Sequence, residues 1–143
     1  TDLGGLIVDG LGDGIFLNVR WPENLEDVNK TAFGILQATR TRITKTEFIS
    51  CPSCGRTLFD LQEVTARIRL KTQHLKGLKI GIMGCIVNGP GEMADADYGY
   101  VGTGIGKISL YKKQEVINRD VPMQEADEAL INLIKDNGDW IDP

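Results

Sequence analysis

The 143-residue chain is long enough to bury its own core, and its 41% hydrophobic and 25% charged residues are typical of globular domains. Its net charge of −4 argues against nucleic acid as the main partner, because phosphate binding needs clustered Lys and Arg. No run approaches the roughly 18 apolar residues of a membrane span, and no secretory signal is visible, so we expect no membrane association and a reducing, cytoplasm-like compartment.

The first 44 residues predict a strand, a glycine loop, a second strand and a helix. Short apolar runs at residues 6–8 and 15–19 indicate the two strands. Asn24 with Asp27 is typical of a helix N-cap, and apolar residues at helical spacing follow until about Thr39. This part of the chain therefore ends in an amphipathic helix.

The remaining residues predict further strands at 46–50, 78–83, 98–101, 107–111 and 115–118. A helix capped by Thr57 and Asp60 is expected directly after the first cysteine pair, and Pro122 opens a last helix that ends before Gly138. Residues 84–91 hold three glycines and a proline, which predicts a loop without regular structure. The order of elements indicates an α/β (α+β) fold, one mixed sheet with helices packed on it.

Two short stretches hold all three cysteines. Cys51 and Cys54 are separated by two residues, so a tight turn brings both sulfurs to the same side, and Cys85 follows 31 positions later. An odd number of cysteines cannot pair completely into disulfides, and a C-x-x-C motif in a non-secreted chain indicates metal or redox use. The pattern predicts a metal or iron–sulfur site that lacks one ligand.

Three interpretations of these cysteines differ in the missing ligand. The thiols are buried core residues with no ligand role, or they form a Cys3His zinc site with His74, the single histidine. In the third interpretation they hold an iron–sulfur cluster, and Glu92 returns to the same centre seven residues after Cys85. An oxygen ligand is more labile than a thiolate and leaves one iron exchangeable, as a catalytic cluster requires.

The cysteine motifs resemble the C-terminal domain of the 4-hydroxy-3-methylbut-2-enyl diphosphate synthases, the iron–sulfur enzymes of the methylerythritol phosphate route to isoprenoids. The resemblance is carried by SCPSCGRT at 50–57 and GCIVNGPGE at 84–92. It continues through MADADYGYVG at 93–102, GKI at 106–108 and LIKD at 133–136, and reaches back to VDGLGD at 8–13. The form of residues 93–97 and of 140–143 is most similar to the larger, plant-type branch.

The resemblance implies that Cys51, Cys54, Cys85 and Glu92 ligate a [4Fe–4S] cluster, and that Asn88 lies beside it facing the substrate. The implied reaction is the two-electron reductive ring opening of 2-C-methyl-D-erythritol 2,4-cyclodiphosphate, with loss of water, to 4-hydroxy-3-methylbut-2-enyl diphosphate. Ferredoxin or flavodoxin would donate the electrons. The cluster domain would resemble the iron–sulfur domain of sulfite and nitrite reductases.

The family holds its substrate diphosphate in a TIM barrel, which 143 residues cannot contain. We therefore expect residues 1–44 to be a trailing segment of the barrel region and residues 45–143 to be the cluster domain. The chain alone should be inactive, and the full-length protein should be a homodimer located in the cytoplasm, or in the plastid stroma of a plant or alga. A stand-alone electron-transfer module and a structural zinc domain are the competing functions.

Overall fold

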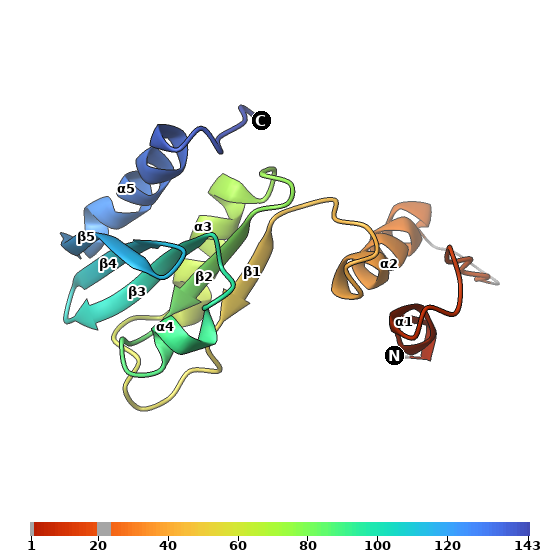
Figure 1. The fold of residues 1–143 in the computed structure, drawn as a ribbon, viewed down its shortest axis with the longest axis horizontal. Helices are drawn as coiled ribbons and strands as arrows, with labels where there is room; N and C mark the ends of the chain where they lie inside the picture. The colour runs from red at the N-terminus through yellow and green to blue at the C-terminus, as the bar shows by residue number, and fades with distance from the viewer. Residues whose placement is uncertain (1, 20–23) are drawn as a thin grey trace. The chain divides into compact units, whose positions relative to one another are not determined.

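A mixed five-stranded sheet forms the centre of the second of two compact units, Thr1–Thr44 and Lys45–Pro143. The computed structural model describes residues 2–19 and 24–143 (Figure 1). Among these residues, no helix has the length and apolar character needed to cross a membrane. The five-stranded sheet and the helices that accompany it confirm the predicted α/β class with one mixed sheet.

The strands follow one another in space in the same order as in the sequence: β1 Glu47–Ser50, β2 Lys79–Met83, β3 Tyr98–Gly104, β4 Lys107–Lys112 and β5 Glu115–Pro122. β1, β2 and β3 are parallel, whereas β4 and β5 continue the sheet antiparallel. Ser50 lies opposite Ile82, so β1 and β2 end at the same edge of the sheet.

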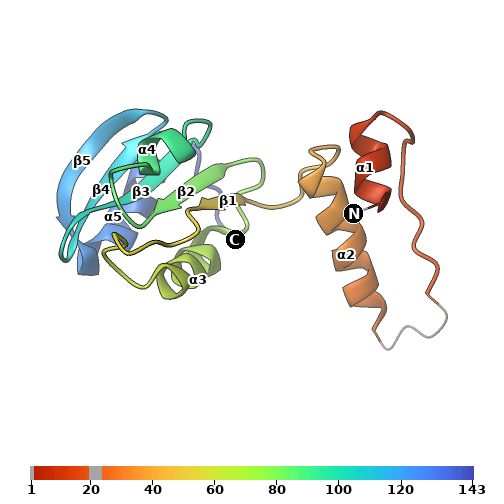
Figure 2. The ribbon, with the colours of Figure 1, turned by 90° about the horizontal axis from the view of Figure 1, so that it is seen from below.

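Two helices, α3 Leu61–Thr72 and α5 Met123–Asp136, cover one face of the sheet, and the short helix α4 Gly89–Glu92 lies on the other side (Figure 2). Alternate strand residues point to opposite faces. The main core therefore takes every second residue of three strands and packs them against the two helices: Ile80, Ile82, Tyr98, Tyr100, Ile108 and Leu110.

The boundaries of the final helix are set by the residues at its two ends. α5 begins directly after Pro122 and ends at Asp136, and Gly138 follows with a φ of +76°, a conformation that glycine adopts without strain. Its buried side chains recur at helical spacing and include Ala126, Leu130 and Ile134. The predicted start, end and inner face of this helix are confirmed.

A second, smaller cluster of buried side chains lies on the α4 side of the sheet and centres on Met93. A Cβ atom at Gly81 would lie 2.7 Å from the Met93 Cβ, and one at Gly99 would lie 2.5 Å from its Cε. These two strand glycines make room for the methionine, so the segment that follows α4 packs closely on β2 and β3.

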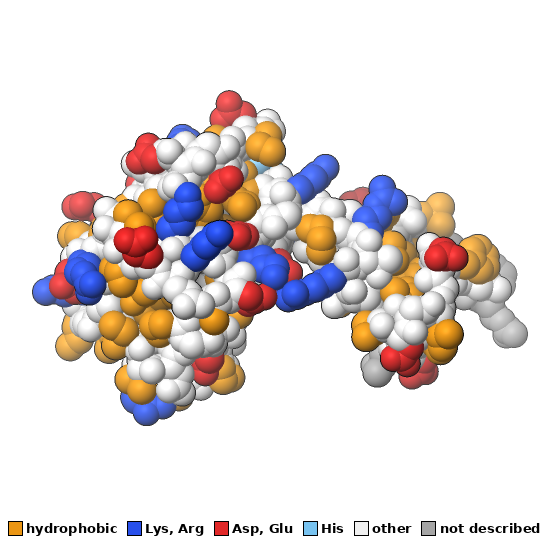
Figure 3. Space-filling model, viewed as in Figure 1, with side chains coloured by type: hydrophobic (Ala, Val, Ile, Leu, Met, Phe, Trp, Pro, Cys, Tyr) orange, Lys and Arg blue, Asp and Glu red, His pale blue; other side chains and the backbone are white. Residues whose placement is uncertain are grey.

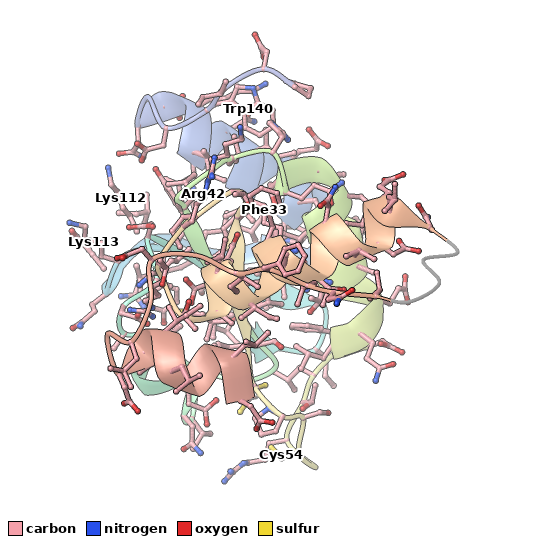
Figure 4. All side chains as sticks on the ribbon, turned by 90° about the vertical axis from the view of Figure 1, so that its right-hand side faces the viewer. Phe33, Arg42, Cys54, Lys112, Lys113 and Trp140 are labelled. Carbon is pink, nitrogen blue, oxygen red and sulfur yellow. The ribbon has the colours of Figure 1, made fainter. Side chains whose placement is uncertain are left out.

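The first unit consists of two helices, α1 Asp2–Val8 and α2 Leu25–Ala38. The Asn24 side chain caps α2 by accepting from the Glu26 amide at 2.9 Å, and it donates to Asp27 at 3.1 Å. Beyond the helix, the Arg42 guanidinium lies 5.3 Å from the centre of the Phe33 ring (Figure 4). The predicted cap and extent of this helix are confirmed.

The two strands predicted in this unit are wrong. Residues 6–8 belong to α1, because Leu3, Leu6 and Ile7 also fit the spacing of a helix, and a short apolar run cannot distinguish the two structures. Residues 15–19 have no regular structure. A strand needs a neighbour for its backbone hydrogen bonds, and the described residues of this unit hold no strand.

Gly102→Ala should lower the free energy of unfolding by about 1–3 kcal/mol, because overpacking forces the surrounding structure to move. A Cβ at Gly102 would lie 2.6 Å from the Gly84 carbonyl oxygen, a backbone atom with little freedom to shift. Gly104→Ala in the same strand is the control, since its Cβ would lie at ordinary contact distance, 3.7 Å from Lys107. Urea unfolding of both variants measures the difference, and equal stability would contradict this packing.

Candidate metal centre

The ends of β1 and β2 bring the cysteine-containing loops together. Cys51 directly follows β1, and Cys85 comes two residues after the end of β2. Because neighbouring parallel strands present their carboxyl ends at the same edge of a sheet, the loops that leave these strands meet there. The sheet topology therefore accounts for the convergence of residues that lie more than 30 positions apart.

All five residues predicted for the site line one cavity of about 80 Å3: Cys51, Cys54, Cys85, Asn88 and Glu92. Cys51 and Cys85 are half-buried, whereas Cys54, Asn88 and Glu92 are exposed. The cavity therefore opens to solvent on the side of these three residues. Its volume is several times the space that one water molecule requires, about 10–15 Å3.

The C-x-x-C turn depends on Thr57. The Thr57 hydroxyl accepts a hydrogen bond from the Cys54 amide at 3.1 Å, and the Thr57 amide donates to the Cys54 carbonyl at 3.0 Å. The predicted helix cap by Thr57 is therefore wrong, and so is the expectation that α3 begins directly after Cys54. Asp60 caps that helix alone, through the Glu63 amide at 2.9 Å.

Gly84 connects the two cysteine loops. Its backbone N–H donates to the Cys51 sulfur at 3.3 Å, and its carbonyl accepts from the Leu58 amide at 3.0 Å. The Gly84 backbone thus joins the loop after β2 to the loop after β1, through the Cys51 side chain and the Leu58 backbone.

The loop that carries Glu92 is more regular than the sequence indicated. Residues 84–91 were expected to have no regular structure, but residues 89–92 form α4, with Pro90 at its start, where a missing N–H costs nothing. Glu92 lies four residues, about one helical turn, after Asn88. The Glu92 amide donates to the Asn88 carbonyl at 3.0 Å. Both residues line the cavity.

Asn88 occupies the N-cap position of α4, but its side chain makes no capping hydrogen bond. Asparagine at such a position usually satisfies a backbone amide of the first turn. Here Asn88 lines the cavity, and its carboxamide is not engaged by the cap. It is therefore available as a hydrogen-bond donor to whatever the cavity contains.

Arg56 supplies positive charge to the cavity. Of the described residues that line it, Arg56 alone is cationic. Hydrogen bonding from its backbone and its guanidinium lowers the pKa of Cys54 below the ordinary value of a thiol. Arg56 is not among the site residues predicted from the sequence, although its position two residues after Cys54 was a usable signal.

His74 is not part of this site, so the zinc interpretation that relied on it is wrong. Its ring nitrogen Nε2 lies 2.9 Å from the Ile141 carbonyl oxygen, and the ring packs edge-on against Trp140 with centroids 5.1 Å apart. Trp140 and Cys54 lie at opposite ends of the second unit (Figure 4). The helix α3 separates the two ends, because it starts near the cysteine loops and finishes just before His74.

The exposed Cys54 also argues against the interpretation of three buried core thiols. On the face shown in Figure 3, Lys and Arg side chains of the second unit are interspersed with Asp and Glu. A nucleic-acid interface would instead need clustered cations. The cavity lined by the three cysteines, Asn88 and Glu92 is therefore the candidate functional site of this unit.

A family model described as the GcpE protein C-terminal domain matches residues 47–136. The chain belongs to this family. The match covers the sheet, its helices and both cysteine loops, so the GcpE C-terminal domain corresponds to the second unit without its last residues.

Relatives of this GcpE domain include enzymes from bacteria and plants. A 4-hydroxy-3-methylbut-2-en-1-yl diphosphate synthase (flavodoxin) from Phocaeicola vulgatus is 66% identical over 140 residues, which are 98% of this chain and 23% of the relative. A chloroplastic 4-hydroxy-3-methylbut-2-en-1-yl diphosphate synthase (ferredoxin) from Arabidopsis thaliana is 59% identical over 143 residues, all of this chain and 19% of the relative. The chain spans about a fifth of the length of these relatives, and the predicted family is confirmed.

Proposed function

We propose that this chain is the C-terminal cluster domain of a reductase that converts 2-C-methyl-D-erythritol 2,4-cyclodiphosphate to 4-hydroxy-3-methylbut-2-enyl diphosphate. One observation carries the proposal: three cysteines, Asn88 and Glu92 line a single cavity in a chain of this family. The names of the relatives supply the product and the class of electron donor, flavodoxin or ferredoxin.

The donor set fits a [4Fe–4S] cluster held by Cys51, Cys54, Cys85 and Glu92. Within residues 2–19 and 24–143, no three Cys, His, Asp or Glu side chains lie close enough together to hold a single metal ion. A cluster of four irons takes one ligand per iron and accepts ligands that are spread further apart. Hydrogen bonds from the backbone and the guanidinium of Arg56 favour the thiolate form of Cys54, which is the form that such a cluster requires.

When bound, the cluster would pass on, one at a time, the two electrons that reductive ring opening takes from reduced flavodoxin or ferredoxin. The residues of the chain have distinct tasks around it. Glu92 offers an exchangeable oxygen ligand on the open side of the cavity, where a substrate oxygen can approach. Asn88 donates a hydrogen bond from its free carboxamide toward that oxygen, which stabilises negative charge as the carbon–oxygen bond breaks.

The first unit belongs to the barrel region in this proposal. Among its described residues no hydrophobic side chain is buried, and many are exposed: Leu3, Leu6, Val8, Leu11, Phe16, Val19, Leu25, Phe33 and Ile43. Two helices without a buried core of their own need a further surface to cover them. The barrel domain of the longer protein would provide this surface and would hold the substrate diphosphate, in a homodimer of the cytoplasm or, in a plant or alga, of the plastid stroma.

Anaerobic reconstitution of the full-length protein with iron and sulfide tests the proposal. We expect broad visible absorbance, about four irons and four sulfides per chain, and product formation with a reduced donor. A loaded protein without turnover of the cyclic diphosphate would support a stand-alone electron-transfer module. A colourless protein that binds zinc would support a structural domain, and either result would overturn the proposed function.

Asn88→Asp in the full-length protein should slow turnover at least tenfold, about 1.4 kcal/mol in the barrier. The substitution keeps the shape of the side chain, removes the donor and adds negative charge beside an anionic cluster. Steady-state turnover of a fully loaded enzyme measures the effect. Asn118→Asp, at an exposed position on β5, is the matched control. Wild-type turnover in the Asn88 variant would remove Asn88 from the reaction.

A further inference from the structure

We propose that Thr57 is a positioning residue that couples the two cysteine loops: its hydroxyl holds the C-x-x-C turn, and its methyl group fixes Gly84 and therefore the loop of Cys85. This inference rests on the proposed function, because it concerns the placement of cluster ligands. Thr57 itself lies outside the cavity, so it acts through Cys54 and Gly84.

The hydroxyl contact stabilises an unusual turn. Ser53 has a φ of +63°, in the left-handed region that residues other than glycine seldom adopt. The Thr57 oxygen lies 3.1 Å from the Cys54 amide and 3.3 Å from the Ser53 hydroxyl. One side chain therefore engages both residues at the strained point of the turn, and this fixes the direction in which the Cys54 side chain leaves the backbone.

The methyl group of Thr57 contacts the loop that carries Cys85. A Cβ atom on Gly84 would lie 2.6 Å from the Thr57 Cγ2 and 2.9 Å from its hydroxyl oxygen. The Thr57 side chain therefore fills the space directly beside the Gly84 backbone. Gly84 precedes Cys85, and its N–H donates to the Cys51 sulfur, so a displacement of Gly84 would move one ligand and remove a hydrogen bond from another.

Gly84 has little freedom to move away from Thr57, because its carbonyl oxygen has two further close neighbours. A Cβ at Gly102 would lie 2.6 Å from the Gly84 carbonyl oxygen, and Leu58 donates to the same carbonyl at 3.0 Å. The Gly84 backbone is thus in contact with β3 as well as with Thr57 and its neighbour Leu58. The size and the hydroxyl of residue 57 consequently set the spacing between Cys54 and Cys85.

Two substitutions in the full-length, reconstituted protein separate the two contacts. Thr57→Val keeps the shape and removes the hydroxyl, whereas Thr57→Ser keeps the hydroxyl and removes the methyl group. Thr57→Val should lose cluster iron to a ferrous chelator about tenfold faster than the wild-type protein, as is typical when an outer contact of a metal ligand is removed. Thr57→Ser should fall between the two, and Thr31→Val, at an exposed position in α2, is the control.

The electron paramagnetic resonance spectrum of the reduced cluster gives a second readout, which a general loss of stability would not change. We expect a shifted spectrum in Thr57→Val and partial recovery in Thr57→Ser. Wild-type iron loss and spectra in both variants would overturn the role of Thr57 and leave the proposed function intact, whereas a wild-type protein that takes up no cluster would overturn the proposed function itself. If the valine variant does not fold, wild-type behaviour of the serine variant would still overturn the coupling of the loops.

Discussion

Glu92→Cys in the full-length protein should keep its iron and sulfide but lose at least tenfold in turnover, about 1.4 kcal/mol or more in the barrier. Glu92 lies on the open side of the cavity, at the end of α4, and a cysteine at this position would complete a set of four thiolates. A thiolate binds iron more firmly than a carboxylate does, so the iron that the substrate needs would no longer exchange its ligand.

Iron and sulfide analysis together with steady-state turnover checks this expectation. Glu115→Cys, at an exposed position at the start of β5, adds a thiol away from the cavity and should leave both quantities unchanged. Loss of the cluster from Glu92→Cys would show that residue 92 cannot reach the iron. Unchanged turnover in a loaded variant would remove Glu92 from the mechanism.

The convergence of these residues on one cavity was predictable because their chemistry restricts their sequence pattern. A C-x-x-C motif and a third cysteine at the end of an apolar strand leave few interpretations, and the parallel pairing of β1 and β2 brings them together. Glu92 could be inferred from its distance to Cys85 across a glycine-proline loop. The metal ligation by these residues is still a prediction, which the reconstitution experiment addresses.

The supporting residues were harder to predict because their patterns have more than one meaning. Thr57 and Asp60 fit the spacing of a helix cap, but Thr57 instead accepts from the Cys54 amide. In the sequence Gly84 looks like an ordinary loop glycine, but in the structure both Gly102 of β3 and Thr57 lie close to it. Such roles depend on contacts between segments distant in sequence, and no local pattern records them.

Strands and helices were also predicted correctly where local sequence defines them, and less well where tertiary contacts decide the structure. α5 was predictable from Pro122, Gly138 and a clear apolar stripe, all of which are local. The run at residues 6–8 was assigned to a strand although it is helical, because three apolar residues in sequence fit both structures. In the second unit, short runs such as residues 78–83 and 98–101 are bounded by loop residues and were correctly predicted as strands, and their side chains divide between the two faces of the sheet.

The 143-residue chain alone should give no detectable product from the cyclic diphosphate, even when its cluster is loaded and a reductant is present. The chain covers 23% of the Phocaeicola vulgatus enzyme and 19% of the Arabidopsis thaliana enzyme, so most of each relative has no counterpart in it. Arg56 alone among the described residues lining the cavity is cationic, and one guanidinium cannot hold a diphosphate in place.

Positioning accounts for the size of the expected loss. Holding a reactant in the correct orientation is worth an effective concentration of about 10^5 M or more, which corresponds to at least roughly 7 kcal/mol of the barrier. Product analysis after single-turnover and steady-state incubation of the loaded chain, beside the full-length protein at equal iron content, measures this contribution. Product from the 143-residue chain would mean that the cavity itself binds the substrate, and the division of tasks between a cluster domain and a barrel would then be wrong.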